Sequence, residues 1–244
     1  MPGFNTIATH YNAMTGFPRR IDRLVELIGP WVTRWQVKRA LDSGCGHGAL
    51  LFALARLGVH AAGIDASEPM LRLALSNARD LGVPITIHSA THATASKLYP
   101  DTFDAVFTIG NALVNAPSER EMTEWLRGLY GALRPGGHLL IQNLNLTPFL
   151  LGLKTQIARR QVGDTEYVRF AKPAPHGGLN FCVTMRGPDG VFDAQFSQWY
   201  PWEAGNLGAC VADAGFREIE FYGSIEGAEY KPRESTDLVI TATR

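Results

Sequence analysis

Three glycines at alternate positions, Gly44, Gly46 and Gly48, constrain this chain more than any other feature of its sequence. The run "RALDSG", which ends at the first of them, is typical of a short buried strand, and "HGALLFALARLG" is typical of a helix. A strand that enters a helix through glycines brings backbone N–H groups and a helix N-terminus to one point, and glycine permits close approach of a ligand there. Asp65 ends the next apolar run, 17 positions after Gly48, and a carboxylate can accept hydrogen bonds from both hydroxyls of a ribose. The stretch therefore predicts a nucleoside-binding loop.

Strands and helices alternate along the first 145 residues. The apolar runs predict strands at 39–44, 59–65, 85–89, 102–110 and 138–143. Helical periodicity is found at 19–28, 47–58, 67–82 and 118–133, and "RPGG" at 134–137 predicts a turn. Because nearly every residue of these strands is apolar, we expect a mostly parallel sheet with helices on both faces, the Rossmann-like form of an α/β fold.

The pattern changes after about residue 145. Aromatic and β-branched residues predict antiparallel strands, with a hairpin turn at "GPDG", residues 187–190. A helix at 203–216 and two strands at 217–223 and 236–243 follow. We expect a single domain over 1–244, with residues 1–37 as an N-terminal helical lid and residues 147–200 as an antiparallel β insertion that covers a substrate.

Composition narrows the range of partners and compartments. Lys plus Arg and Asp plus Glu number 23 each, so the chain lacks the basic excess of a protein that binds nucleic acid. The three cysteines are widely spaced, which fits a reducing compartment. No secretory signal or membrane span is visible, and no pairing of acids with a histidine suggests a metal site. These observations predict a cytoplasmic protein without a nucleic-acid partner, a membrane partner or a metal.

The spacing of the glycines separates two kinds of nucleoside ligand. The dinucleotide fingerprint is G-x-G-x-x-G, whereas this loop is G-x-G-x-G. The run "LDSGCGHG" resembles motif I of the class I S-adenosylmethionine-dependent methyltransferases, and "DASEPML", "FDAVFTIGNAL" and "LRPGGHLLIQN" resemble later motifs of that family. "AGFREIEFYG", with the strand after it, resembles the family's C-terminal hairpin. The resemblance implies a seven-stranded sheet with an antiparallel last strand, and S-adenosylmethionine as the cofactor.

The resemblance also assigns roles to residues around this cofactor. Asp65 would bind the ribose hydroxyls with Ala66 and Met70 beside the adenine, and Asp42 would suit a ligand that carries an ammonium group. Thr91 stands where many members of the family have an acid that contacts the adenine, and His92 could cover the ring. The residues expected to bind the cofactor are Arg20, Asp42, Gly44, Cys45, Gly46, Gly48, Asp65, Ala66, Met70, Thr91, His92, Gly110 and Asn111.

Candidate residues for the methyl acceptor come from three further segments. "HYNAMTGFPRR" resembles the entry segment of glycine/sarcosine-type small-molecule N-methyltransferases, which implies Tyr11 near the sulfonium and Arg20 paired with the cofactor carboxylate. By the same resemblance, Asn111 lies beside the methionine portion or the acceptor, and Asn145 contacts the acceptor. From its residue type, Arg169 could bind an acceptor carboxylate or be a solvated arginine of a strand edge. His176 could act as a base or be an exposed loop histidine.

Together these features predict a methyltransferase that acts on a small molecule, more readily at an amine nitrogen than at a hydroxyl. A small-molecule O-methyltransferase and a non-catalytic cofactor-binding subunit are the alternatives within the family. A nicotinamide-dependent reductase is the alternative from another class, and the loop spacing opposes it. A homodimer is one assembly that we consider.

Overall fold

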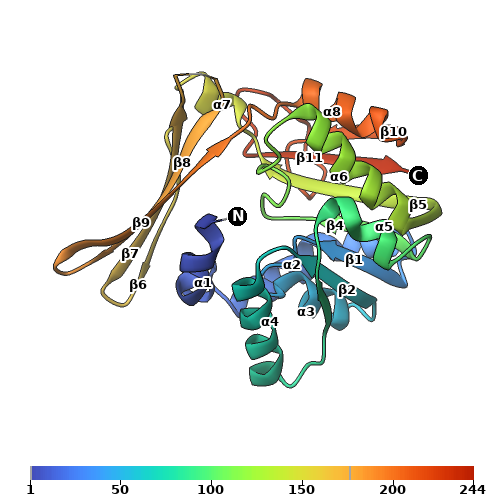
Figure 1. Ribbon diagram of the computed structural model, residues 1–244, viewed down its shortest axis with the longest axis horizontal. Helices are drawn as coiled ribbons and strands as arrows, with labels where there is room; N and C mark the ends of the chain where they lie inside the picture. Colours follow the sequence, from blue (N-terminus) through green and yellow to red (C-terminus); the bar gives the residue numbers. More distant parts are fainter. Residues whose placement is uncertain (1, 176) are drawn as a thin grey trace.

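The computed structural model describes residues 2–175 and 177–244, and the alternating strands form one seven-stranded sheet (Figure 1). In spatial order the strands are β10 (Arg217–Tyr222), β11 (Asp237–Thr243), β5 (Leu133–Leu144), β4 (Phe103–Thr108), β1 (Arg39–Ser43), β2 (His60–Asp65) and β3 (Thr86–Ser89). The five strands from β5 to β3 are parallel. β11 runs antiparallel to both β5 and β10. The expected mostly parallel sheet with an antiparallel last strand is confirmed.

Helices cover both faces of this sheet, as the apolar strands require. One face carries α2 (Arg19–Arg34), α3 (Ala49–Arg56) and α4 (Glu68–Leu81). The other carries η1 (His92–Thr94), α5 (Ala95–Leu98), α6 (Glu119–Ala132) and α8 (Ala204–Asp213). Successive strand residues pack on opposite faces: Ala40 of β1 contacts the α2–α3 side, and Leu41 contacts the α6 side.

The "RPGG" segment is a correction to the expected elements. A turn is expected at 134–137, but β5 begins at Leu133 and continues through these residues. Leu133 pairs with Phe103 of β4, and the register shifts before His138 pairs with Ala105. Gly136 adopts a left-handed φ of 74°. The glycines therefore make an irregularity within a strand rather than a separate turn.

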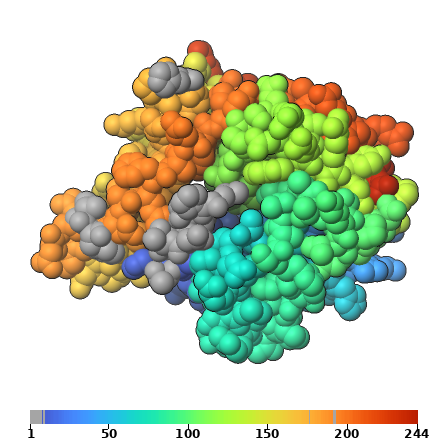
Figure 2. Space-filling view, in the orientation of Figure 1, coloured from blue at the N-terminus to red at the C-terminus, as the bar shows by residue number. Residues whose placement is uncertain are grey.

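The later part of the chain forms a second, antiparallel sheet. After α7 (Thr147–Leu150) come β6 (Gln156–Val162), β7 (Thr165–Pro173), β8 (Leu179–Gly187) and β9 (Gly190–Trp199), which pair in that order. The expected hairpin at 187–190 joins β8 to β9, with Gly187 paired to Gly190. In Figure 2 this sheet forms the gold and orange side of the molecule.

The N-terminal helix α1 (Pro2–Thr15) lies between the two sheets (Figure 1). Met14 of α1 packs in a cluster with Tyr167, Val183 and Met185, which belong to β7 and β8. On its other side α1 contacts α4. Residues 2–15 therefore contribute to the core of the antiparallel sheet and also border the larger sheet domain.

The strand order reverses beside β1, because β2 and β3 lie on one side of it and β4 and β5 on the other. Loops that follow neighbouring parallel strands diverge at such a point and leave a crevice at the carboxyl ends of the strands. The residues that sequence motifs single out follow β1, β2 and β4, so the topology brings them to this crevice.

Candidate active site

A cavity with about 1020 Å³ of empty space, its open mouth included, occupies the crevice at the ends of β1, β2 and β4. The cavity is bounded by the loops after these strands, by α1 and α2, and by one face of α6. It brings together most of the residues that the sequence predicts. Those are Tyr11, Arg20, Asp42, Gly44, Cys45, Gly46, Asp65, Ala66, Met70, Thr91, His92, Gly110 and Asn111.

The glycine loop adopts the backbone that its sequence predicts. Gly44, Gly46 and Gly48 have φ values of 85°, 53° and 86°, all in the left-handed region that favours glycine. A Cβ on Gly44 would lie 2.6 Å from the Cβ of Ala112, so no larger residue fits. Gly48 does not line the cavity; a Cβ there would meet Phe52 at 3.2 Å, so this glycine permits α3 to pack closely.

Asp65 fixes the shape of the cavity at the end of β2. One carboxylate oxygen accepts a hydrogen bond from Gly46 N and the other from Ser67 N, both at 2.8 Å. Burial raises the pKa of Asp65, while these N–H donors lower it. A carboxylate has about four acceptor positions, so two remain for ligand hydroxyls. Ala66, which precedes α4, and Met70 of α4 line the same cavity.

Asp42 is a buried carboxyl group with an unsatisfied oxygen. It is 3% exposed, and its Oδ2 has no hydrogen-bond partner among the described residues. Burial, with a further contribution from the charge of Asp65, raises its pKa from 3.8 to about 8, although Arg20 opposes the shift. A buried polar atom without a partner costs free energy unless a ligand satisfies it. This atom fits the polar, cation-bearing end of the expected cofactor.

A pair of rings closes the cavity beyond β3. The ring of His92 lies 5.0 Å from the ring of Trp125 of α6, and Ser43 Oγ lies 2.6 Å from His92 Nδ1. Burial lowers the pKa of His92 to about 4, so the imidazole is neutral. Trp125 is absent from the sequence-predicted set, although it lines the cavity. The sequence feature that could have identified Trp125 is its large aromatic side chain, which stands one position before Leu126 and outside the apolar stripe of α6.

The loop after β4 forms the wall opposite α2. Asn111 has a left-handed φ of 70°, and its Oδ1 accepts a hydrogen bond from Leu144 N at 2.5 Å. A Cβ on Gly110 would lie 3.4 Å from the guanidinium of Arg20, so the Arg20 side chain reaches this loop, and both residues line the cavity. Asn115, which the sequence does not single out, lines the same wall.

α1 contributes an aromatic wall that meets the glycine loop at His47. The His47 ring makes edge contacts with Tyr11 and Phe17, with centroids 4.9 and 5.4 Å apart. Burial, with a smaller effect of Arg20, lowers the pKa of His47 to about 3. Burial also raises the pKa of the Tyr11 hydroxyl. His47 is a site residue that sequence reasoning missed, because its role depends on the position of α1.

A polar chain attaches α1 to the same loop. Asn12 Nδ2 donates to Asn77 Oδ1 at 2.7 Å, and Asn77 Nδ2 donates to the carbonyl oxygen of His47 at 2.9 Å. The position of α1 is thereby tied to the backbone of the cofactor loop.

Two predicted acceptor residues, Arg169 and Asn145, lie outside the lining of the cavity. Arg169 of β7 is half-buried, and burial lowers its pKa. Asn145 is 1% exposed, and its Nδ2 donates to the carbonyl oxygens of Pro232 and Ser235. Its amide therefore holds the backbone of the segment before β11. Tyr230 OH and Thr147 N both donate to its Oδ1. His176 lies outside the described residues.

Two expected absences concern the described residues only. Over 2–175 and 177–244, no group of three or more His, Cys, Asp or Glu side chains is placed to hold a metal ion. None of the helices in that part of the chain has the length and apolarity needed to cross a membrane.

Residues 40–137 match a family described as "Methyltransferase domain". A ubiquinone biosynthesis O-methyltransferase from Aeromonas salmonicida is 28% identical over 180 residues, which are 70% of this chain and 74% of the relative. Another protein of that name, from Xanthomonas euvesicatoria, is 32% identical over 56% of this chain and 57% of its own length. The family match includes the glycine loop, Asp65 and the loop after β4.

Solved structures share the fold at low sequence identity. An S-adenosylmethionine-dependent methyltransferase from Clostridium acetobutylicum superposes with a TM-score of 0.78 at 11% identity, over 98% of each chain. A sugar N-methyltransferase from a Streptoalloteichus species superposes with a TM-score of 0.67 at 22% identity, over 90% of this chain and 86% of its own. An amino pentose methyltransferase from Micromonospora echinaspora, solved with S-adenosylmethionine bound, gives a TM-score of 0.62 at 18% identity over 99% and 91%.

Proposed function

We propose that this class I S-adenosylmethionine-dependent methyltransferase transfers a methyl group to the nitrogen of a small amine that also carries an anionic group. The observation that carries the proposal is the cavity itself. It brings Asp65, the glycine loop and the loop after β4 together on one side and Tyr11 on the other. A small molecule can therefore lie beneath α1 and against the cofactor at the same time.

The cofactor fits the residues of the larger sheet domain. We propose that Asp65 binds the ribose hydroxyls, that His92 and Trp125 enclose the adenine, and that Arg20 and Asp42 bind the carboxylate and ammonium ends of the methionine portion. The left-handed glycines support close approach of a ligand, and the unsatisfied oxygen of Asp42 supports a ligand donor beside it. When bound, the cofactor supplies an activated methyl group on a sulfonium. The remaining task of the protein is to align the acceptor and exclude water.

Nitrogen is the favoured acceptor atom because the two groups that meet at this wall, His47 and Tyr11, both have pKa values shifted away from neutral pH. His47 has a pKa of about 3, and burial raises the pKa of Tyr11, so neither group readily removes a proton from a hydroxyl. A neutral amine attacks through its lone pair and loses its proton afterwards. The similarity to curated O-methyltransferases favours a second candidate, transfer to a phenolic hydroxyl.

An anionic group on the acceptor would satisfy Arg169. This side chain lies on β7 between its cross-strand neighbours Ala158 and Val183, and no described ion pair includes it. Its pKa is affected by Tyr11, Arg20 and Arg160, so positive charge gathers near α1. A half-buried guanidinium without an acid is costly, and a ligand carboxylate could form two parallel hydrogen bonds with it. These charges support a negatively charged acceptor.

The test combines binding with methyl transfer. Calorimetry with S-adenosylhomocysteine and with NADH should show micromolar binding of the first only. Transfer of labelled methyl groups is then measured on matched panels of amines and phenols, each with and without a carboxylate. Transfer to phenols alone would replace the nitrogen proposal with the oxygen one. Binding without transfer to any panel would instead support a non-catalytic subunit.

A pair of arginine variants tests the acceptor charge. Arg169→Met should raise KM for an anionic amine by about tenfold to a hundredfold, as expected for a lost charge-assisted hydrogen bond. Its affinity for S-adenosylhomocysteine should not change. Arg159→Met is the matched control, because Arg159 is exposed on β6 and already paired with Glu166 at 3.2 Å. Equal KM values in the two variants would refute the role of Arg169.

A further inference from the structure

Gln142 of β5 links the cavity wall to a neighbouring strand without lining the cavity itself. Its Oε1 accepts a hydrogen bond from Gly110 N at 2.7 Å, and its Nε2 donates to Asp237 Oδ1 at 3.0 Å. Its backbone carbonyl also accepts from Asn111 N at 3.3 Å. Gln142 thus accepts hydrogen bonds from the backbone N–H groups of Gly110 and Asn111. The orientation of its side-chain amide is fixed by Asp237.

These two N–H groups belong to residues that line the cavity together with Arg20. Gly110 and Asn111 both have left-handed φ values, 79° and 70°, so the loop needs an external partner to hold this backbone. Arg20 lies at the beginning of α2, and its guanidinium approaches Gly110 closely. The distance between this loop and α2 sets the width of the cavity at the end assigned to the methionine portion.

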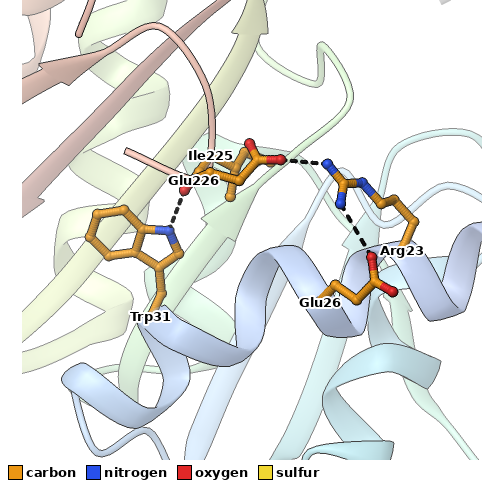
Figure 3. Close-up of polar contacts among 5 residues, drawn as sticks. All are labelled: Arg23, Glu26, Trp31, Ile225 and Glu226. Carbon is orange, nitrogen blue, oxygen red and sulfur yellow. Dashed lines mark hydrogen bonds and ion pairs between the residues drawn. The ribbon is translucent and has the colours of Figure 1, made fainter. Parts of the chain in front are cut away.

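The segment that precedes Asp237 also attaches to α2, as Figure 3 shows. Trp31 Nε1 donates to the carbonyl oxygen of Ile225 at 2.7 Å, and Arg23 forms ion pairs with Glu226 and with Glu26. Residues 225–237 therefore contact α2 at one end and Gln142 at the other. The connection between β10 and β11 is therefore linked to both α2, which carries Arg20, and the loop that carries Gly110.

We propose that Gln142 and Asp237 form a positioning pair that places Gly110 and Asn111 opposite Arg20 and so sets affinity for the amino-acid end of the cofactor. Neither side chain touches the ligand. Asp237 orients the amide so that its oxygen, rather than its NH₂, accepts the hydrogen bond from Gly110 N. This hydrogen bond sets the position of the loop. The inference rests on the proposed cofactor site, but it concerns the geometry of the loop and can be measured without turnover.

The experiment reverses the polarity of the pair. Gln142→Glu keeps the shape of the side chain but sets a carboxylate against Asp237, so the loop should lose its support. We expect the affinity for S-adenosylhomocysteine to fall by about tenfold, the equivalent of one hydrogen bond. Hydrogen exchange at the Gly110 and Asn111 amides should become faster. The double variant Gln142→Glu/Asp237→Asn restores a donor opposite the new carboxylate, and both quantities should return to within about threefold of wild type.

A control and a kinetic measurement separate positioning from general stability. Gln198→Glu makes the same chemical change on an exposed residue of β9 and should leave affinity and exchange unchanged. In methyl-transfer assays, Gln142→Glu should raise KM for the cofactor more than it lowers kcat. The proposal is overturned if Gln142→Glu binds and exchanges like wild type, or if the double variant recovers thermal stability but not affinity. Failure of the wild-type protein to bind S-adenosylhomocysteine would overturn the proposed function instead, and then only the exchange measurement would decide the role of the pair.

Discussion

Replacing Asp42 with asparagine should stabilise the protein near neutral pH, because the native fold keeps this buried carboxyl group protonated. Burial and the charge of Asp65 raise its pKa from 3.8 to about 8, whereas the unfolded chain ionises the same group at its ordinary value. At pH 7, folding must therefore protonate Asp42 at about three pH units above the pKa that this group has in the unfolded chain. At about 1.4 kcal/mol per unit, this cost is on the order of 4 kcal/mol.

The sign of the effect follows from the two pKa values. The native state binds the proton more tightly, so the stability contributed by Asp42 is greatest below about pH 4 and is lost as the pH rises towards about 8. The asparagine variant lacks this loss. The difference in free energy of unfolding, variant minus wild type, should grow by up to about 1.4 kcal/mol per pH unit across that window.

Urea unfolding at about pH 5, 6, 7 and 8, followed by circular dichroism, measures this difference. Other titrating groups, among them His47 and His92, are present in both proteins and cancel. A difference that is independent of pH, or a variant that is less stable at every pH, would refute the reasoning. In the same samples the variant should bind S-adenosylhomocysteine more weakly, because an amide, unlike the carboxyl group, cannot lose a proton when an ammonium group binds beside it. Greater stability with weaker binding would mark Asp42 as a residue kept for function.

Three further predictions test other parts of the site. Gly44→Ala should abolish binding of S-adenosylhomocysteine in calorimetry and lower the Tm, since its Cβ would lie 2.6 Å from another side chain; Gly58→Ala, also at a left-handed φ but with open space, should cost only stability. His47→Gln should flatten the loss of stability as the pH falls below about 6.5, because the native pKa of His47 is about 3 and the unfolded chain gains the proton first; an unchanged slope in acid unfolding would contradict this. Trp31→Phe keeps a ring but loses the hydrogen bond to Ile225, and urea unfolding should show about 1 kcal/mol of lost stability.

The sheet domain follows from the sequence because its signals are local. Apolar runs define the strands, and the glycine loop with Asp65 defines the switch point. Gly82 ends α4 with the left-handed φ that a C-terminal glycine predicts. Ser118 accepts a hydrogen bond from Glu121 N at the start of α6, as their spacing predicts. The segment 134–137 could not be predicted in this way, because its glycines are held by backbone hydrogen bonds to Arg244, the residue that follows β11 and is distant in sequence.

The acceptor side depends on contacts between distant parts of the chain, and sequence reasoning is correspondingly weaker there. His47 and Trp125 line the cavity because α1 and α6 reach it, which no local pattern reports. Asn145 has the residue type of an acceptor contact, but its amide is fully engaged with the connection before β11. Gln142 lies in an apolar strand, and its polar side chain was the only sequence feature that could have drawn attention to it.

The placement of α1 has a thermodynamic consequence. Its Met14 belongs to the core of the antiparallel sheet, while Asn12 is joined through Asn77 to the glycine loop that we propose binds the methyl donor. An acceptor that shifts this helix must change the affinity for the donor, and the donor must change the affinity for that acceptor by the same factor. Titrating each ligand in the presence of the other would therefore give equal ratios, and the size of that ratio measures how firmly the first fifteen residues connect the two halves of the reaction.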